Sequence, residues 1–105
     1  MKRHHFYILL SLAGRARHGL DVMRDVLELT EGELKLWPAT LYGSLDELVE
    51  QEWIEELADA ASRPAGESEK KRYYRITASG RSALEHETRR IEALAGLARL
   101  RLTEG

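Results

Sequence analysis

The sequence lacks cysteine and has no long hydrophobic run. Its 105 residues include no cysteine, which excludes disulfide bonds and metal sites built on thiolates and is typical of a cytoplasmic protein. The longest apolar run, residues 6–10, is far below the ~18 residues that a membrane-spanning helix needs. Basic residues precede this run, as in a signal peptide, but no small-residue cleavage pattern follows it. We therefore expect a cytoplasmic protein that is neither secreted nor inserted in a membrane.

The motifs of the common enzyme classes are also missing. The sequence has no glycine-rich phosphate loop, no nucleophile elbow and no cysteine nucleophile. Its histidines do not form a metal-ligand set, because His4 and His5 are adjacent while His18 and His86 are isolated. We predict no catalytic residue, no metal and no cofactor.

What is present is one domain's length of chain with an uneven charge distribution. The formal net charge of −2 is unfavourable for binding nucleic acid until its distribution is considered. Residues 1–18 and 70–81 carry basic side chains and no acid, whereas residues 46–59 carry acidic side chains and no base. A mildly acidic protein with this segregation can still present a basic face to phosphates.

Two helices are predicted in the first third of the chain. Residues 5–13 are almost continuously apolar and end at Gly14, which indicates a short buried helix with a glycine stop. A second helix begins at His18, whose neutral ring suits a capping hydrogen bond. One face of this helix carries Leu20, Met23 and Leu27, and it is widened by Val22, Val26 and Leu29.

A third helix is predicted to begin at Pro38, because proline fits the first helical turn, and to fade near Gln51. Its apolar stripe consists of Leu41, Leu45, Leu48 and Val49. Residues 30–35 form the connection to it. Two helices joined by a short turn, the second with small polar residues in its first turns, form the helix-turn-helix pattern.

Two strands follow, at residues 53–57 and 72–76, and the second is rich in aromatic and branched side chains. The residues between them include proline, glycine and serine, which predict a long hairpin tip. Because the first strand is acidic and the second is basic, we expect cross-strand ion pairs. The candidate partners are Glu55 or Glu56 with Arg72 or Arg75.

A long amphipathic helix is predicted from Ala78 to about Leu102, where no proline interrupts the chain. A helix of this length has little of its own domain left to pack against. We therefore expect its apolar stripe to meet a second copy of the chain, through Leu84, Ile91, Leu94, Ala95 and Ala98. In the alternative interpretation, this helix folds back over the first helix of its own chain.

The order of these elements predicts a mainly α fold with a small two-stranded β wing: a winged helix-turn-helix followed by a long C-terminal helix. Residues 1–77 would form a DNA-binding domain and residues 78–105 a dimerisation helix. The chain resembles the PadR family of bacterial transcriptional regulators, in its short form with a single C-terminal helix. The resemblance rests on HGLDVM at residues 18–23, on the spaced pattern Leu36, Pro38, Thr40-Leu41-Tyr42, Leu45 and Leu48, and on KRYYRIT with Gly80-Arg81 at residues 71–81.

Three positions depart from the family pattern. The family often has glycine where this chain has Ala39, and proline where it has Gly43. It usually has glycine before the first wing strand, where this chain has Glu52-Trp53. These departures concern the entry, the course and the exit of the third helix.

The resemblance implies specific binding to double-stranded promoter DNA, usually as a homodimeric repressor that a small molecule or another signal releases. Some relatives stack planar aromatic compounds on a tryptophan of the C-terminal helix. This chain has no aromatic residue from Arg81 to Leu102, and its Trp37 and Trp53 flank the third helix instead. We therefore predict no such stacking pocket, and the effector stays unidentified.

The residues predicted to contact DNA lie on the third helix and the second wing strand. Short side chains let a helix approach a groove, and hydroxyls reach base edges or phosphates. The helix candidates are Thr40, Tyr42, Gly43 and Ser44, and the wing candidates for the phosphate backbone are Lys70, Lys71, Arg72 and Tyr73. Since the first helical turn has no arginine, asparagine or glutamine, specificity would come partly from DNA shape.

Two alternatives stay open for this surface. The Tyr42 ring packs half-buried against the wing in one of them. In the other, the chain is a protein-interaction module that uses the acidic face of its third helix and never touches DNA.

Overall fold

The computed structural model describes residues 1–57 and 72–105. These residues form, in order, α1 (Arg3–Ala13), β1 (Arg17–His18), α2 (Gly19–Leu29), α3 (Pro38–Glu50), β2 (Ile54–Leu57), β3 (Tyr73–Ile76) and α4 (Ala78–Glu104). The mainly helical fold with a small β wing and a long last helix is as predicted. The predicted hairpin tip, together with Lys70 and Lys71, lies outside the described residues.

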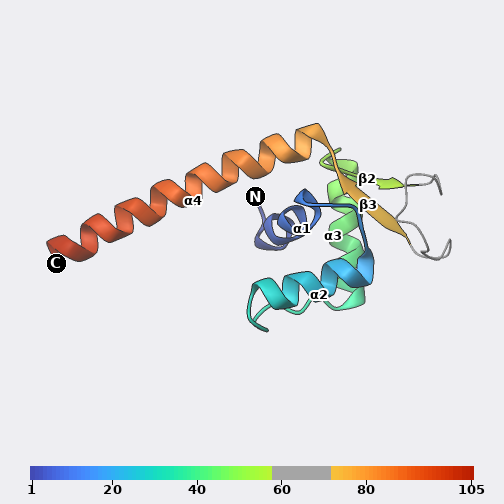
Figure 1. The fold of residues 1–105 in the computed structure, drawn as a ribbon, viewed down its shortest axis with the longest axis horizontal. Coiled ribbons are helices and arrows are strands. Elements are labelled where there is room, and N and C mark those ends of the chain that lie inside the picture. Colours follow the sequence, from blue (N-terminus) through green and yellow to red (C-terminus); the bar gives the residue numbers. More distant parts are fainter. Residues whose placement is uncertain (58–71) are drawn as a thin grey trace.

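Helices α1, α2 and α3 enclose one hydrophobic core with the sheet beside them (Figure 1). The predicted stripe of α3 is confirmed for its three leucines, Leu41, Leu45 and Leu48, which are fully buried. Val49 is exposed at the margin of this stripe. On α2 the predicted apolar face is confirmed at Val22 and Val26, which are fully buried, whereas Leu20 and Leu29 at its margins are exposed.

Helices α2 and α3 end in the same backbone arrangement, the Schellman motif, in which a residue of left-handed conformation follows the helix. After α3 this residue is Glu52, with φ 62°. The N–H of Trp53 donates to the Leu48 carbonyl at 3.0 Å, and the N–H of Glu52 donates to the Val49 carbonyl at 2.9 Å. Glu31 has the equivalent place after α2, with φ 53°. Glu52 therefore holds the conformation for which glycine is best suited.

The three strands form an antiparallel sheet in the order β1-β3-β2. The register pairs Glu55 with Arg75 and Glu56 with Tyr74. An ion pair joins Glu55 to Arg75, and another joins Glu56 to Arg72, so both predicted cross-strand pairs are confirmed. The third strand, β1, was not predicted, because two residues are too few to show the alternation of a strand.

The first turns of α4 pack on their own chain. The Thr77 hydroxyl caps the helix by accepting from the Gly80 N–H at 3.0 Å. A Cβ at Gly80 would collide with the Trp53 carbonyl oxygen, so glycine is required for this close approach. Further along, Leu84 packs against the core and Arg81 donates to the Ala13 carbonyl at 2.9 Å. The alternative in which the last helix folds back on the first therefore holds for these turns.

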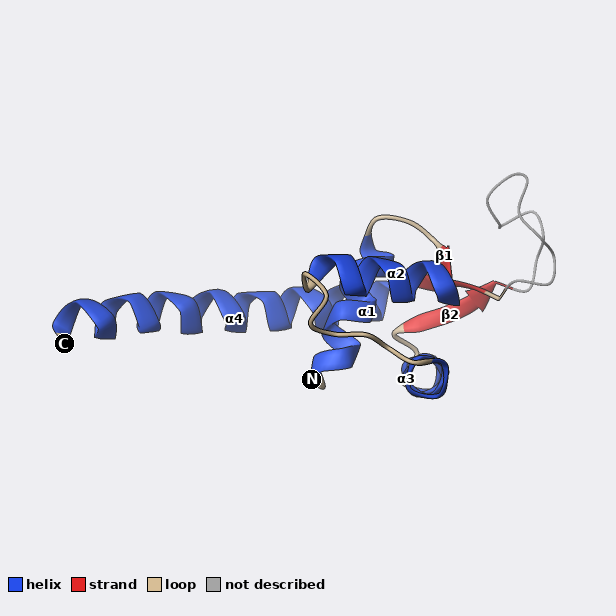
Figure 2. Ribbon diagram, turned by 90° about the horizontal axis from the view of Figure 1, so that it is seen from below, coloured by secondary structure: helices blue, strands red, loops and turns tan. Residues whose placement is uncertain are grey.

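Beyond Glu87, every residue of α4 is exposed. This part of the helix extends away from the other elements in both ribbon views (Figures 1 and 2). From Leu94 onward, no element of the described chain covers its apolar side chains, whereas Ile91 lies beside Phe6 of α1.

Candidate nucleic-acid interface

The exposed face of α3 lies opposite its buried leucines and carries small side chains near its beginning. Ala39, Thr40 and Gly43 are all exposed there. A Cβ at Gly43 would meet no atom within 4 Å, so the fold itself does not require glycine at this position. Ser44, in contrast, is only 8% exposed and belongs to the core side of the helix. This face therefore allows a close approach to the backbone at residues 39, 40 and 43.

The ring of Tyr42 fills the space between α3 and the start of α2. It is half-buried against the core. A Cβ added at Gly19 would lie 2.6 Å from the Tyr42 hydroxyl oxygen, so a larger residue at the first position of α2 would require the ring to shift. Packing within the domain therefore accounts for the position of the Tyr42 ring, and only part of the ring is accessible to a ligand.

Arg72 joins the wing to α3. Its guanidinium makes two hydrogen bonds to the Glu56 carboxylate, at 3.0 and 3.2 Å, and lies 3.8 Å from the nearest Asp46 oxygen. It also lies 5.7 Å from the ring centre of Tyr42 and 5.6 Å from that of Tyr74, within the range of cation–π attraction. The hydrogen bonds to Glu56 raise the pKa of Arg72. The side chain is 47% exposed, so a fixed positive charge meets solvent beside α3.

The two tyrosines of β3 are buried on opposite sides of the strand. Tyr74 belongs to the core, and burial raises its pKa to about 12. Tyr73 is 1% exposed and packs edge-on against the His18 ring, with 5.5 Å between the ring centres. The Nδ1 of His18 in turn accepts from the Asp21 N–H at 3.2 Å, which confirms the predicted cap of the second helix. In this conformation Tyr73 is therefore a packing residue.

An ion-pair cluster connects the start of α1 to the exposed side of α3. One oxygen of Glu47 accepts from the Lys2 ammonium at 3.0 Å and lies 2.9 Å from Nε2 of the buried His5. Burial lowers the pKa of His5, while the hydrogen bond from Lys2 lowers the pKa of Glu47. This cluster was not predicted, because Lys2 and His5 lie 45 and 42 residues from Glu47 in the sequence and no local pattern links them.

A model of the PadR-like family of transcriptional regulators matches residues 8–86. This range runs from α1 through the wing to the packed turns of α4. The chain belongs to this family. PadR-like proteins are transcriptional regulators, which bind DNA, and are not enzymes.

Solved structures of regulators have the same fold. A PadR family transcription regulator from Clostridium difficile is 19% identical, with a TM-score of 0.78 over 96% of this chain and 99% of that one. A transcriptional regulator from Clostridium thermocellum is 20% identical, with a TM-score of 0.74 over 91% and 86% of the two chains. BpsR of Bordetella bronchiseptica is 18% identical, with a TM-score of 0.70 over 91% of this chain and 59% of that one. No curated protein sequence matches the chain.

The residues predicted to contact DNA differ in their exposure in this PadR-like chain. Thr40, Gly43 and Arg72 are exposed near one another in the fold, on α3 and the adjoining wing strand, and Tyr42 is partly exposed between them. Ser44 and Tyr73 are buried. The predicted contacts at residues 70 and 71 lie outside the described part of the chain.

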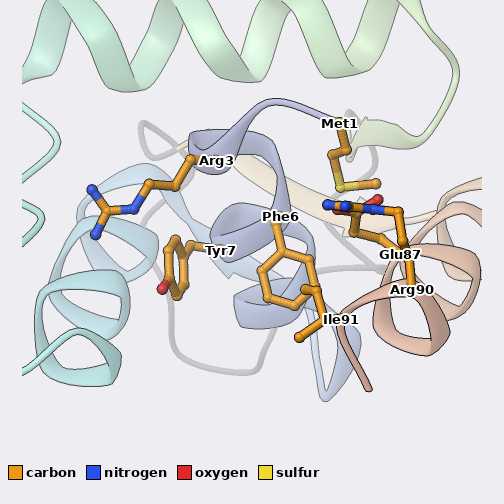
Figure 3. A pocket seen from close by; sticks show the side chains of 7 residues that line it. All are labelled: Met1, Arg3, Phe6, Tyr7, Glu87, Arg90 and Ile91. Atoms are coloured by element: carbon orange, nitrogen blue, oxygen red, sulfur yellow. The ribbon is translucent and has the colours of Figure 1, made fainter. Parts of the chain in front are cut away.

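A hollow of the PadR-like chain lies away from α3, between the start of α1 and α4 (Figure 3). Its volume is about 380 Å³, and Phe6 and Ile91 point toward one another in it. At its edge the Arg90 Nε donates to the Glu87 carboxylate at 3.1 Å, and this hydrogen bond lowers the pKa of Glu87. The hollow is lined by α1, α4 and the first residue of the chain, and not by α3 or the wing.

The described residues offer neither a membrane-spanning helix nor a metal site. None of the helices in residues 1–57 and 72–105 is long and apolar enough to cross a membrane. The same residues contain no cluster of three histidine or acidic side chains that could hold a metal ion. The cytoplasmic location stays a prediction.

Proposed function

We propose that this PadR-like regulator represses transcription by binding promoter DNA as a homodimer, with α3 in the major groove. The observation that carries the proposal is the exposed face of small residues on α3 beside the fixed charge of Arg72. The hydroxyl of Thr40 would meet a base edge, Gly43 would allow the close approach of the helix, and Arg72 would meet a phosphate. Lys70 and Lys71 would extend this phosphate contact along the wing. Because Ser44 and Tyr73 are buried, we give them supporting roles in place of the DNA contacts predicted for them.

The homodimer is supported by the uncovered apolar side chains of α4. Ile91, Leu94 and Leu97 are between 40% and 51% exposed, on a helix that continues beyond its own domain. Together with Ala95 and Ala98 they form a surface that a second α4 would cover. We leave Leu84 out of this interface, because it packs inside its own chain. A two-fold dimer would present two α3 helices to half-sites about one helical turn of DNA apart, roughly 34–36 Å.

Release by a signal is the third part of the proposal. BpsR, one of the structural relatives, is described as having its DNA binding regulated by 6-hydroxynicotinic acid. In this chain the hollow between α1 and α4, with its aromatic and aliphatic lining, is a candidate effector site. A molecule bound there would contact α1. This helix also carries His5, which connects it to Glu47 on α3 through the ion-pair cluster.

The decisive experiment is binding of the purified protein to the DNA upstream of its own gene, titrated in salt with random DNA of equal length as competitor. We expect binding that outlasts the competitor and weakens as salt is added. Equal and weak binding to both DNAs would contradict a specific regulator. The acidic residues exposed on α3, Asp46, Glu47 and Glu50, would then favour a basic protein partner.

A further inference from the structure

Among the described residues, Trp37 stands at a position that folding alone does not explain. It stands at the N-cap of α3, directly before Pro38, and its side chain makes no capping hydrogen bond. Serine, threonine, aspartate or asparagine would cap the helix at this position. Trp37 is also 63% exposed, although an indole left in water is unfavourable. A position that breaks local rules in this way often serves function rather than stability.

Lys35 accompanies this ring. Its ammonium nitrogen lies 4.2 Å from the centre of the Trp37 ring, which is a favourable cation–π distance. Leu36, between them, is fully buried and fixes the segment to the core. The side chains of residues 35 and 37 therefore stand together at the surface, one positively charged and one aromatic.

This pair adjoins the face proposed to read DNA. Ala39 and Thr40, in the first turn of α3, are exposed directly after it. A DNA duplex offers alternating phosphates and apolar atoms along its edge, so it complements a cation held beside an aromatic ring. An apolar ligand would not use the charge of Lys35.

We propose that Trp37 packs its indole against apolar atoms of the bound DNA duplex, either deoxyribose carbons or thymine methyl groups, while Lys35 contacts the adjoining phosphate. This inference rests on the proposed function, since it requires α3 to be the DNA-reading helix. It makes Trp37 an anchor at the leading end of α3, in the place where a capping residue would otherwise stand.

Tryptophan fluorescence tests the contact directly, because Trp53 is the only other tryptophan. In a Trp53→Phe variant the emission reports Trp37 alone. Titration with the duplex from upstream of the gene should change this emission and reduce its quenching by acrylamide. Should that variant fail to fold, the wild-type signal minus that of Trp37→Phe supplies the same quantity. The emission of Trp37→Phe itself, which reports Trp53, should change little.

Affinity provides the second readout. Trp37→Ala should weaken binding to this duplex about tenfold at fixed salt and leave the salt dependence unchanged. Lys35→Ala should instead flatten the salt dependence by about 0.9 in slope, the effect of one lost phosphate contact. The matched control is Leu29→Ala, which removes a comparably exposed apolar side chain from the far end of α2 and should leave affinity unchanged. Replacing thymine by deoxyuridine in the duplex distinguishes the two apolar sources, because only a methyl contact would be lost.

The possible failures are separable. If the duplex binds but Trp37 stays accessible to acrylamide and Trp37→Ala binds normally, the inference is wrong and the proposed function stands. If the wild-type protein binds neither this duplex nor random duplex at low salt, the proposed function fails and the inference with it. If Trp37 becomes protected on self-association without DNA, a second copy of the chain is its partner and the inference is overturned.

Discussion

The leucine stripes of α3 and α4 look alike in the sequence and have opposite surroundings. On α3, Leu41 and Leu45 are fully buried, whereas on α4 Leu94 and Leu97 are 51% and 42% exposed. Both stripes follow helical spacing, so periodicity identified an apolar face in each case. It did not identify what covers that face. In α3 the cover is the chain's own core, and in α4 the described chain supplies none from Leu94 onward.

The largest expected effect tests the buried side of this comparison. Leu45→Ala should lower the free energy of unfolding by about 2–5 kcal/mol, because it leaves a cavity among α1, α2 and α3. Leu94→Ala should cost far less in a dilute sample, where an exposed side chain loses no core contacts. Denaturant unfolding of both variants at low protein concentration measures the difference. Equal losses would mean that α4 is covered under these conditions too.

A charge on the exposed stripe tests the proposed dimer. Ile91→Asp should give a monomer that still folds but no longer binds operator DNA tightly, because a carboxylate is costly to bury between two helices. Analytical ultracentrifugation and circular dichroism measure these two properties. Glu92→Ala, on the polar side of the same turn, is the control and should remain dimeric. A wild-type protein that sediments as a monomer would contradict the dimer.

Substitution of Arg72 tests whether the wing contacts DNA. Arg72→Ala should weaken binding to specific and random DNA alike and flatten the salt dependence by about 0.9 in slope. Arg75 has the same charge and is likewise paired with a glutamate, Glu55, but Arg72 lies beside Tyr42 of the proposed DNA-reading helix. Arg75→Ala should therefore change the slope less. An unchanged slope for Arg72→Ala would argue against the wing contact.

The buried His5 makes the stability of the domain depend on pH. Burial lowers the pKa of His5, so the folded protein binds a proton there less readily than the unfolded chain. The stability that this difference represents is present above the unfolded pKa of 6.5 and is lost as the pH falls below it. His5→Gln should therefore reduce the loss of stability on acidification from about pH 7 to about pH 5.5.

The smallest expected effect concerns the exit from α3. Glu52→Gly should change stability between about 0 and +1 kcal/mol, because relief of the left-handed conformation is partly offset by the flexibility of glycine in the unfolded chain. Arg24→Gly, in the exposed middle of α2, should instead cost about 1 kcal/mol. Thermal unfolding of both variants separates the two outcomes. A clear loss for Glu52→Gly would contradict the strain.

Local patterns were sufficient to predict most elements of the fold. Proline at position 38, glycine at position 14 and the aromatic run before Thr77 identified the helix and strand limits within a few residues. The cap at His18 and the ion pairs across β2 and β3 also followed from neighbouring residues and opposite charges. The resemblance to PadR regulators rested on these same local features, and it was confirmed by the family model that matches residues 8–86.

The site was less predictable, because burial depends on residues that are distant in sequence. Ser44 and Tyr73 have hydroxyls in the right segments, but the core covers one and His18 packs against the other. Strand β1 gave no signal of its own, since two residues become a strand only when β3 lies beside them. The exposure of Trp37 was equally hidden, because a tryptophan beside a leucine is ordinarily expected in the core.

By itself, the sequence determined which residues turn, cap, pair and form apolar stripes, because these properties arise from backbone sterics and from contacts within a few residues. Only the tertiary structure decided which side of each stripe is covered and which charges meet. Lys2, His5 and Glu47 come together because α1 packs on α3, and Arg72 faces α3 because β3 is paired between β1 and β2. Long-range packing has no period along the chain, so these contacts could be known only from the fold.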